Sequence, residues 1–237
     1  MTESALAAAL LTAWRGGPPV PAATTPPADE AAAYVVQEAM TAGLGGIGGW
    51  KVGAASPTTP PQGSPLPAPC LIASGSGFAG RMRGVELELA LRLARDVPAG
   101  AALTLADFDA ALPVLELVET RLDDWPAAPA LLKLADLGNH GALVLGQPVI
   151  GPIPALATLE AELRFDGAVV AHTIGGSTAG TLEHLLAGLS RRPGARFFKG
   201  QVITTGALTG LLVAPAGAQV TGRLAGLGEV SARFTDG

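Results

Sequence analysis

Cysteine is nearly absent from this sequence of 237 residues, in which Cys70 is the single thiol. One cysteine cannot form an intrachain disulfide, and it excludes a metal centre built from several cysteines. Positive charge is also scarce, because 15 basic residues stand against 20 acidic ones. A chain with no excess of positive charge is poorly suited to neutralise phosphates, so no nucleic-acid partner is expected.

Long apolar runs are absent as well. The longest uncharged stretches are each broken by proline, glycine or polar side chains, so none is typical of a membrane span; they are residues 52–80, 137–159 and 200–222. Near the N-terminus, the apolar residues 5–14 follow Glu3 instead of a positively charged leader, which argues against a secretory signal peptide. We therefore expect a soluble cytoplasmic protein without membrane contact.

Hydrophobic residues, in contrast, make up 49% of the chain, and charged residues only 15%. A chain of this length and composition can bury a sizeable core, even with 32 glycines and 20 prolines. No internal repeat and no clear linker divides it. The pattern favours one α+β structural unit, with a helical N-terminal region over residues 1–50 and a β-rich domain over residues 51–237.

Two helices are predicted in the N-terminal region. In the first, apolar residues recur every four positions at Leu6, Leu10 and Trp14, and glycines follow the last of them. The second helix is expected to begin at Thr25, as its cap, and to end at Gly43.

A long irregular loop is predicted next, over residues 56–69, which contain six prolines. Strands are predicted after it, because a large apolar residue occupies every second position from Val85 to Leu91 and residues 114–118 form a mostly apolar run. Thr104 and Asp107 suit the cap of a short helix between these strands. Further strands are predicted over residues 163–165, 169–174, 201–205, 219–224 and 229–234, with one helix over residues 182–189.

Two carboxylates stand two residues apart at Glu86 and Glu88, within the predicted strand 85–92. Residues at this spacing point to one face of a strand, with Cα atoms about 6–7 Å apart. Carboxylate oxygens are suitable ligands for Mg²⁺, Mn²⁺ or Ca²⁺. The alternative is that both glutamates lie on the solvated face of a half-exposed sheet.

A third carboxylate, Glu116, interrupts the apolar run 114–118. A glutamate buried in such a run needs a partner, because an unpaired carboxylate is strongly disfavoured in an apolar environment. The residue pattern leaves three partners open: a metal ion shared with Glu86 and Glu88, an arginine such as Arg121, or water at the strand end.

Lys51 lies among apolar and glycine neighbours, in the segment Gly49-Trp50-Lys51-Val52-Gly53. Its ammonium can bind an anion there, or Lys51 can be an ordinary strand lysine whose stem is covered. The segment Thr204-Thr205-Gly206 ends a predicted strand and offers hydroxyls for a carboxylate, although it also suits a plain turn. The histidines have no ligand-like spacing and are interpreted as structural; they are His140, His172 and His184.

Several motifs occur in a characteristic order along nearly the whole chain. Those of the first half are Trp50-Lys51-Val52-Gly53, Val85-Glu86-Leu87-Glu88-Leu89-Ala90 and Arg95-Asp96-Val97-Pro98. Those of the second half are Leu115-Glu116-Leu117-Val118, Ala135-Asp136, Val144-Leu145-Gly146, Thr205-Gly206-Ala207-Leu208 and Gly226-Leu227-Gly228. In this order they resemble the 2-keto-4-pentenoate hydratase group of the fumarylacetoacetate hydrolase superfamily.

This resemblance implies a mixed β-roll of the fumarylacetoacetate hydrolase C-terminal-domain type, and a homodimer or an assembly of dimers. It also implies a divalent metal, Mg²⁺ or Mn²⁺, held by Glu86, Glu88 and Glu116. Lys51 then becomes the active-site lysine, and Thr205 becomes a hydroxyl that contacts the substrate.

The chain departs from the family pattern around the expected pocket. Leu137 follows Ala135-Asp136 where these hydratases usually have asparagine, and the segment Pro69-Cys70-Leu71-Ile72 replaces the usual Pro-x-x-Gly-x-Leu. Changes at a pocket rim bear on which substrate is accepted and on whether the chain is active.

The implied activity is that of a metal-dependent hydratase, a hydro-lyase of aromatic-compound catabolism. Such an enzyme adds water to a 2-hydroxy-2,4-dienoate and gives a 4-hydroxy-2-oxo acid. A 4-oxalocrotonate-type decarboxylase needs the same stabilised dienolate and is the second hypothesis. The third is a non-catalytic member of the family that binds small keto acids.

Overall fold

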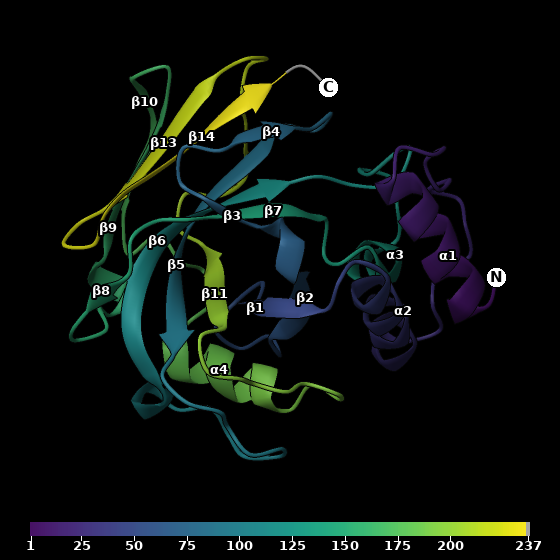
Figure 1. The fold of residues 1–237 in the computed structure, drawn as a ribbon, viewed down its shortest axis with the longest axis horizontal. Helices are drawn as coiled ribbons and strands as arrows, with labels where there is room; N and C mark the ends of the chain where they lie inside the picture. The colour runs from purple at the N-terminus through teal and green to yellow at the C-terminus, as the bar shows by residue number, and fades with distance from the viewer. Residues whose placement is uncertain (236–237) are drawn as a thin grey trace.

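Two β-sheets form the body of the protein, and α-helices lie around them in residues 1–235, which the computed structural model describes (Figure 1). The helices are α1 (Glu3–Trp14), α2 (Glu30–Gly43), α3 (Ala130–Ala135) and α4 (Leu182–Ser190). Short 3₁₀ turns occupy Ala68–Cys70, Leu105–Asp107 and Leu156–Thr158.

The larger sheet has mixed strand directions, with β1 parallel to β11 and most other pairs antiparallel. Its strand order is β2 (Gln62–Pro67), β1 (Ile47–Gly53), β11 (Val202–Ala207), β5 (Gly84–Leu93), β6 (Phe108–Val118), β7 (His140–Leu145) and β3 (Leu71–Ala73). Two short strands pair at its side, β12 (Leu212–Val213) with β5 and β8 (Val149–Ile150) with β6.

The smaller sheet covers one face of the larger one. Its order is β10 (Ala168–Ile174), β9 (Glu160–Phe165), β13 (Gln219–Leu224), β14 (Gly228–Thr235) and β4 (Gly77–Ala79). β13 and β14 pack on β5 and β6, and Gly222 makes this approach possible. A Cβ atom on Gly222 would lie 2.6 Å from Cδ1 of Leu87 and 3.0 Å from Cδ2 of Leu115. The main hydrophobic core lies between the two sheets and extends to α4.

A second hydrophobic cluster holds α1, α2 and α3 together at one side of the sheets (Figure 1). Leu10, Val36 and Met40 are fully buried in it, and Leu132 joins them from α3. α2 contacts β2, while α4 packs on both β1 and β2. The helices therefore support the strand pair that carries Lys51.

The prediction of an α+β fold is confirmed, and the more specific β-roll description stays a prediction. The first helix lies where the sequence pattern places it. The second begins later, at Glu30, because the side chain of Asp29 and not Thr25 accepts the hydrogen bond that caps it. The consecutive prolines Pro26-Pro27 explain the shift, since the residue before a proline is disfavoured in helical conformation.

The loop prediction over residues 56–69 is wrong for its second half, which forms β2 and pairs antiparallel with β1. Prolines such as Pro65 are tolerated in β2 because it is an edge strand of the sheet. The division into residues 1–50 and 51–237 stays a prediction, and β1 crosses that boundary. No helix within residues 1–235 is both long and apolar enough to span a membrane.

A buried ion pair fixes the turn between α3 and β7. Nε of Arg121 lies 2.5 Å from Oδ1 of Asp136, and the guanidinium also donates to the backbone oxygens of Asp136 and His140. The ring of Trp14 lies 4.5 Å from the guanidinium carbon and joins α1 to this group. Both charged side chains are almost completely buried.

We expect Arg121→Met to lower the free energy of unfolding by about 3–5 kcal/mol, because it leaves a buried carboxylate without its partner. Urea denaturation followed by circular dichroism measures this change. Arg164→Met is the matched control, since Arg164 is exposed and its pair with Glu162 is screened by solvent. Equal unfolding midpoints for the two variants would contradict a stabilising role for the buried pair.

Candidate metal centre

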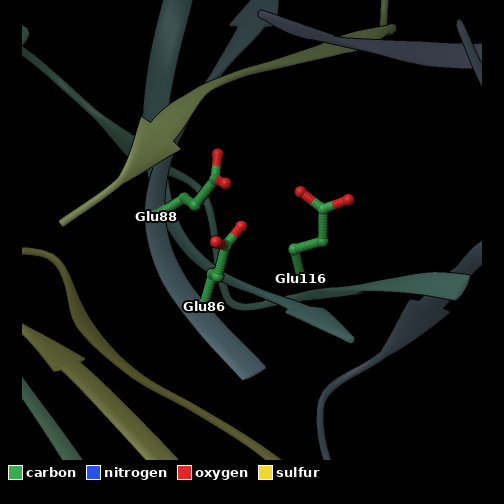
Figure 2. Close-up of side chains that lie close together, drawn as sticks. All are labelled: Glu86, Glu88 and Glu116. Atoms are coloured by element: carbon green, nitrogen blue, oxygen red, sulfur yellow. The ribbon is translucent and has the colours of Figure 1, made fainter. Parts of the chain in front are cut away.

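Three carboxylates from two neighbouring strands converge on one point. Glu86 and Glu88 lie on the same face of β5, and Glu116 of β6 stands directly opposite Glu86 in the antiparallel register. Each glutamate offers one oxygen, and these oxygens all lie within 4.8 Å of one another. Figure 2 shows the three side chains turned toward a common space. Glu88 and Glu116 are buried, and Glu86 is partly buried.

Burial and mutual repulsion shift two of these carboxylates toward their protonated forms. Burial, reinforced by the charge of Glu116, raises the pKa of Glu86 to about 7. The same causes raise the pKa of Glu88 well above its ordinary value. A divalent cation bound between the carboxylates would relieve this repulsion, because it supplies positive charge where the three oxygens meet.

Glu116 differs because cationic and hydrogen-bonding groups surround it. Nζ of Lys51 lies 2.5 Å from Oε1 of Glu116, and Nδ1 of His140 lies 3.1 Å from the same oxygen. Burial alone would raise the pKa of Glu116, but Lys51 and His140 outweigh it and lower the pKa to about 2. For Lys51, burial opposes the charged form, yet the carboxylates of Glu116, Glu86 and Glu88 hold its pKa above the usual value.

The second oxygen of Glu116 supports a bound cation. Within residues 1–235, Oε2 of Glu116 is buried and has no hydrogen-bond partner, since Lys51 and His140 both contact Oε1. A buried charged oxygen without a partner is costly. Together with Glu86 and Glu88, this oxygen makes an all-oxygen donor set of the kind that Mg²⁺, Mn²⁺ or Ca²⁺ prefers. The residues present therefore fit a hard divalent cation.

Strand register decides which threonine faces the carboxylates. Thr204 pairs with Lys51 on one side and with Ala90 on the other, which puts its side chain on the same face as Lys51 and Glu88. Thr205 points to the opposite face, where its buried hydroxyl donates to the backbone oxygen of Leu89.

A cavity of about 290 Å³ opens beside the carboxylates. Its lining includes Lys51, the three glutamates and Thr204, but Thr205 is not part of it. At its edge, the backbone N–H of Gly206 donates to Oε2 of Glu88 at 3.0 Å. A larger cavity of about 560 Å³ lies elsewhere, beside Trp14 and Cys70, and none of the clustered carboxylates lines it. The smaller cavity, called the acidic cavity below, is therefore the one that contains the carboxylate cluster.

The structure thus brings together four of the five residues that the sequence analysis singled out. Thr205 is the one that it does not bring to the cavity, and substrate contact through its hydroxyl stays a prediction. His140 was interpreted as structural, which stays a prediction, and the structure places its Nδ1 beside Oε1 of Glu116. The signal for it was present, since a buried glutamate needs a partner, but the sequence did not identify that partner.

Relatives of known name match most of the chain, although no family model matches it. A 2-keto-4-pentenoate hydratase of Burkholderia vietnamiensis is 30% identical over 183 residues, which is 74% of this chain and 66% of the relative. The chain belongs to the 2-keto-4-pentenoate hydratase group. A 2-hydroxyhexa-2,4-dienoate hydratase of Comamonas testosteroni is 29% identical over 64% of this chain. The alignments with these two span 60–66% of the relatives' length.

Solved structures share the fold of this hydratase-group chain. A 4-oxalocrotonate decarboxylase from Pseudomonas putida G7, complexed with magnesium and adipate, superposes with a TM-score of 0.84 at 23% identity, and the match covers 98% of this chain and 97% of the other. A 2-hydroxyhepta-2,4-diene-1,7-dioate isomerase from Mycobacterium marinum reaches 0.63 at 16% identity, with 81% of this chain and 77% of that chain covered. The chain therefore shares the α+β fold of these enzymes.

Glu88→Gln keeps the shape of a side chain in the acidic cluster but removes one negative ligand. Loss of a residue that only supports a metal ligand costs roughly 10- to 100-fold in metal affinity. We expect the affinity for Mn²⁺ to fall by at least this factor, because Glu88 is a proposed ligand itself. Isothermal titration calorimetry measures it, and circular dichroism checks the fold. Glu229→Gln, at an exposed position of β14, is the control and should bind Mn²⁺ like the parent. Unchanged Mn²⁺ binding by Glu88→Gln would rule out the three-carboxylate site.

Proposed function

We propose that this protein is a metal-dependent hydratase that adds water to a 2-hydroxy-2,4-dienoate and gives a 4-hydroxy-2-oxo acid. The observation that carries the proposal is the cluster of three carboxylates beside Lys51, in a cavity of a chain that belongs to the hydratase group. The substrate is then a small 2-oxo or 2-hydroxydienoic acid. A homodimeric assembly stays a prediction.

Glu86, Glu88 and Glu116 would hold Mg²⁺ or Mn²⁺, since their oxygens are close together and Oε2 of Glu116 is unpartnered within the described chain. When bound, the cation supplies Lewis-acid stabilisation of negative charge on the carboxylate and 2-oxo oxygens of the substrate. His140 holds Oε1 of Glu116 in place and so leaves Oε2 directed to the cluster.

Besides the metal ion, the side chain of Lys51 would provide positive charge at the site. Its ammonium donates to Glu116 and to the backbone oxygen of Gly138, at 2.5 and 3.1 Å. An ammonium has three N–H donors, so one remains for the carboxylate of the substrate. Lys51 would neutralise that carboxylate or move a proton while the dienol ketonises.

A decarboxylase of the 4-oxalocrotonate type is the second candidate, and the structural match with such an enzyme favours it. Loss of CO₂ from an unsaturated 2-oxo diacid also develops negative charge on the 2-oxo group, so the same residues would serve both reactions. A non-catalytic protein that binds small keto acids is the third. Binding of Mg²⁺ and oxalate tests whether the site is intact. An intact site would bind both, whereas a site that has lost its function would bind neither.

A panel of 2-hydroxydienoates, followed by ultraviolet absorbance with parallel detection of CO₂, tests these candidates. The hydratase proposal predicts loss of the dienoate absorbance in the presence of Mg²⁺ or Mn²⁺ without release of CO₂. Chelation with EDTA should abolish the reaction, and added metal should restore it. Equimolar CO₂ would identify the decarboxylase instead, and turnover that survives EDTA would contradict the metal-dependent mechanism.

Lys51→Met retains much of the apolar stem and removes the ammonium. We expect folding and Mn²⁺ binding to persist while turnover falls by about 10²- to 10³-fold, the usual effect of losing one donor to a developing oxyanion. Steady-state kinetics on the accepted dienoate measure the effect. Lys199→Met, at an exposed position, is the control. Near-parental turnover of Lys51→Met would remove Lys51 from the mechanism.

A further inference from the structure

A second cavity, of about 400 Å³, adjoins the acidic one. The two cavities share Lys51, Gly53 and Ala54 in their linings, so they meet beside Lys51. The second cavity extends away from the carboxylate cluster, toward the N-terminus of α2 and the edge strand β2. Its wall includes Glu30 of α2 and Gln62 and Ser64 of β2.

The charges around this second cavity are unbalanced. Among its lining residues within the described chain, Glu30 and Lys51 are the charged ones, and Lys51 is already paired with Glu116. Gln62 donates from Nε2 to Oε1 of Glu30 and so ties this carboxylate across from α2 to β2. The positive end of α2 is already compensated, because Asp29 caps it and Glu30 lies in its first turn.

Ser64 adds a neutral donor at the junction of the two cavities. It pairs with Lys51 across β2 and β1, so the two side chains share one face of the sheet. Both side chains lie close to Gly138. A Cβ atom added to Gly138 would lie 3.3 Å from Oγ of Ser64 and 3.6 Å from Nζ of Lys51. Oγ of Ser64 accepts from Nε2 of Gln37 at 2.8 Å, which leaves the hydroxyl proton for another acceptor.

We infer that the second cavity receives the tail of the substrate beyond its 2-oxo acid head group, and that Glu30 selects tails without a second carboxylate. This inference rests on the proposed function, which places the head group between the carboxylate cluster and Lys51. A chain that extends from Lys51 then passes Ser64 and meets Glu30. A neutral or hydroxylated tail finds a hydrogen-bond donor there, whereas an anionic tail meets a like charge.

The chemical class that fits is therefore a monocarboxylic 2-oxo acid or dienol, and not a diacid. Arg192 does not change this conclusion, because it is not part of the cavity lining. Its guanidinium is buried against the rings of Tyr34 and Trp50, and it donates to the backbone of Gly63 and to Gln37.

Two six-carbon probes with the same head group test the inference: 2-oxohexanoate, with an uncharged tail, and 2-oxoadipate, with a second carboxylate. We expect the Mg²⁺-loaded protein to bind 2-oxohexanoate about fivefold or more tightly than 2-oxoadipate at low salt, as measured by calorimetry. Salt should reduce this ratio, because it screens the repulsion.

Glu30→Gln should bring the ratio of the two affinities close to one, mainly through tighter binding of 2-oxoadipate. Gln62→Ala, which releases Glu30 from its tether, should also reduce the ratio. Glu38→Gln is the matched control, since Glu38 lies on the same helix, carries the same charge and is not part of the cavity lining. It should keep the parental ratio.

The outcomes separate the inference from the proposed function. Equal binding of both probes by the parent, or a ratio that survives Glu30→Gln, would overturn the inference and leave the proposed function standing. Binding of oxalate together with Mg²⁺, but of neither six-carbon acid, would also overturn only the inference. A protein that binds none of the three in the presence of Mg²⁺ would overturn both.

Discussion

The buried charge of Glu116 is the constraint on which the rest of the site depends. The negative charge of a buried carboxylate needs a hydrogen-bonding or charged partner. In Glu116 both partners from the protein contact the same oxygen, because Lys51 of β1 and His140 of β7 each lie beside Oε1. The other oxygen is left to the cluster with Glu86 and Glu88. Because β1, β6 and β7 each contribute one group, the site forms only when the large sheet is complete.

The turn before β7 has an unusual backbone conformation. Leu137, Gly138 and Asn139 all have positive φ angles, between 52° and 60°. Leucine is a poor residue for this conformation, whereas asparagine, which the family usually has there, tolerates it better. The turn is held by the buried pair of Arg121 and Asp136, and Leu137 is itself packed in the helical cluster. Packing and the ion pair hold the strained conformation in place. In this conformation the backbone oxygen of Gly138 accepts a hydrogen bond from Nζ of Lys51.

The helical region and the sheet are therefore parts of one site. α2 supplies Glu30 to the wall of the second cavity and Gln37 to the hydroxyl of Ser64. Arg192, at the end of α4, in turn donates to Gln37 and to the backbone of Gly63 in β2. These contacts hold β2 against the helices, and Gln62 and Ser64 of β2 line the second cavity.

Features that depend on residues close together in the chain could be predicted from the sequence alone. Alternation along a strand was enough to place Glu86 and Glu88 on one face, because a strand repeats every two residues. The cap formed by Thr104 and Asp107 was also predictable, since its hydrogen bonds span only three residues. The apolar neighbours of Glu116 indicated that its carboxylate needs a partner, without deciding which one, and the order of the motifs indicated the family.

The contacts between residues far apart in the chain, in contrast, become visible in the folded protein and not in the sequence. Whether Thr204 or Thr205 faces the cavity depends on the register of β11 against β1 and β5, which no local pattern encodes. His140 reaches Glu116 through the pairing of β6 with β7 and a shift in their register. The prolines of β2 predicted a loop because their missing N–H groups weaken a ladder, but an edge strand needs donors on one side only. Local bonds fix the periodicity of a segment, whereas partner and register are set by the packing of the whole sheet.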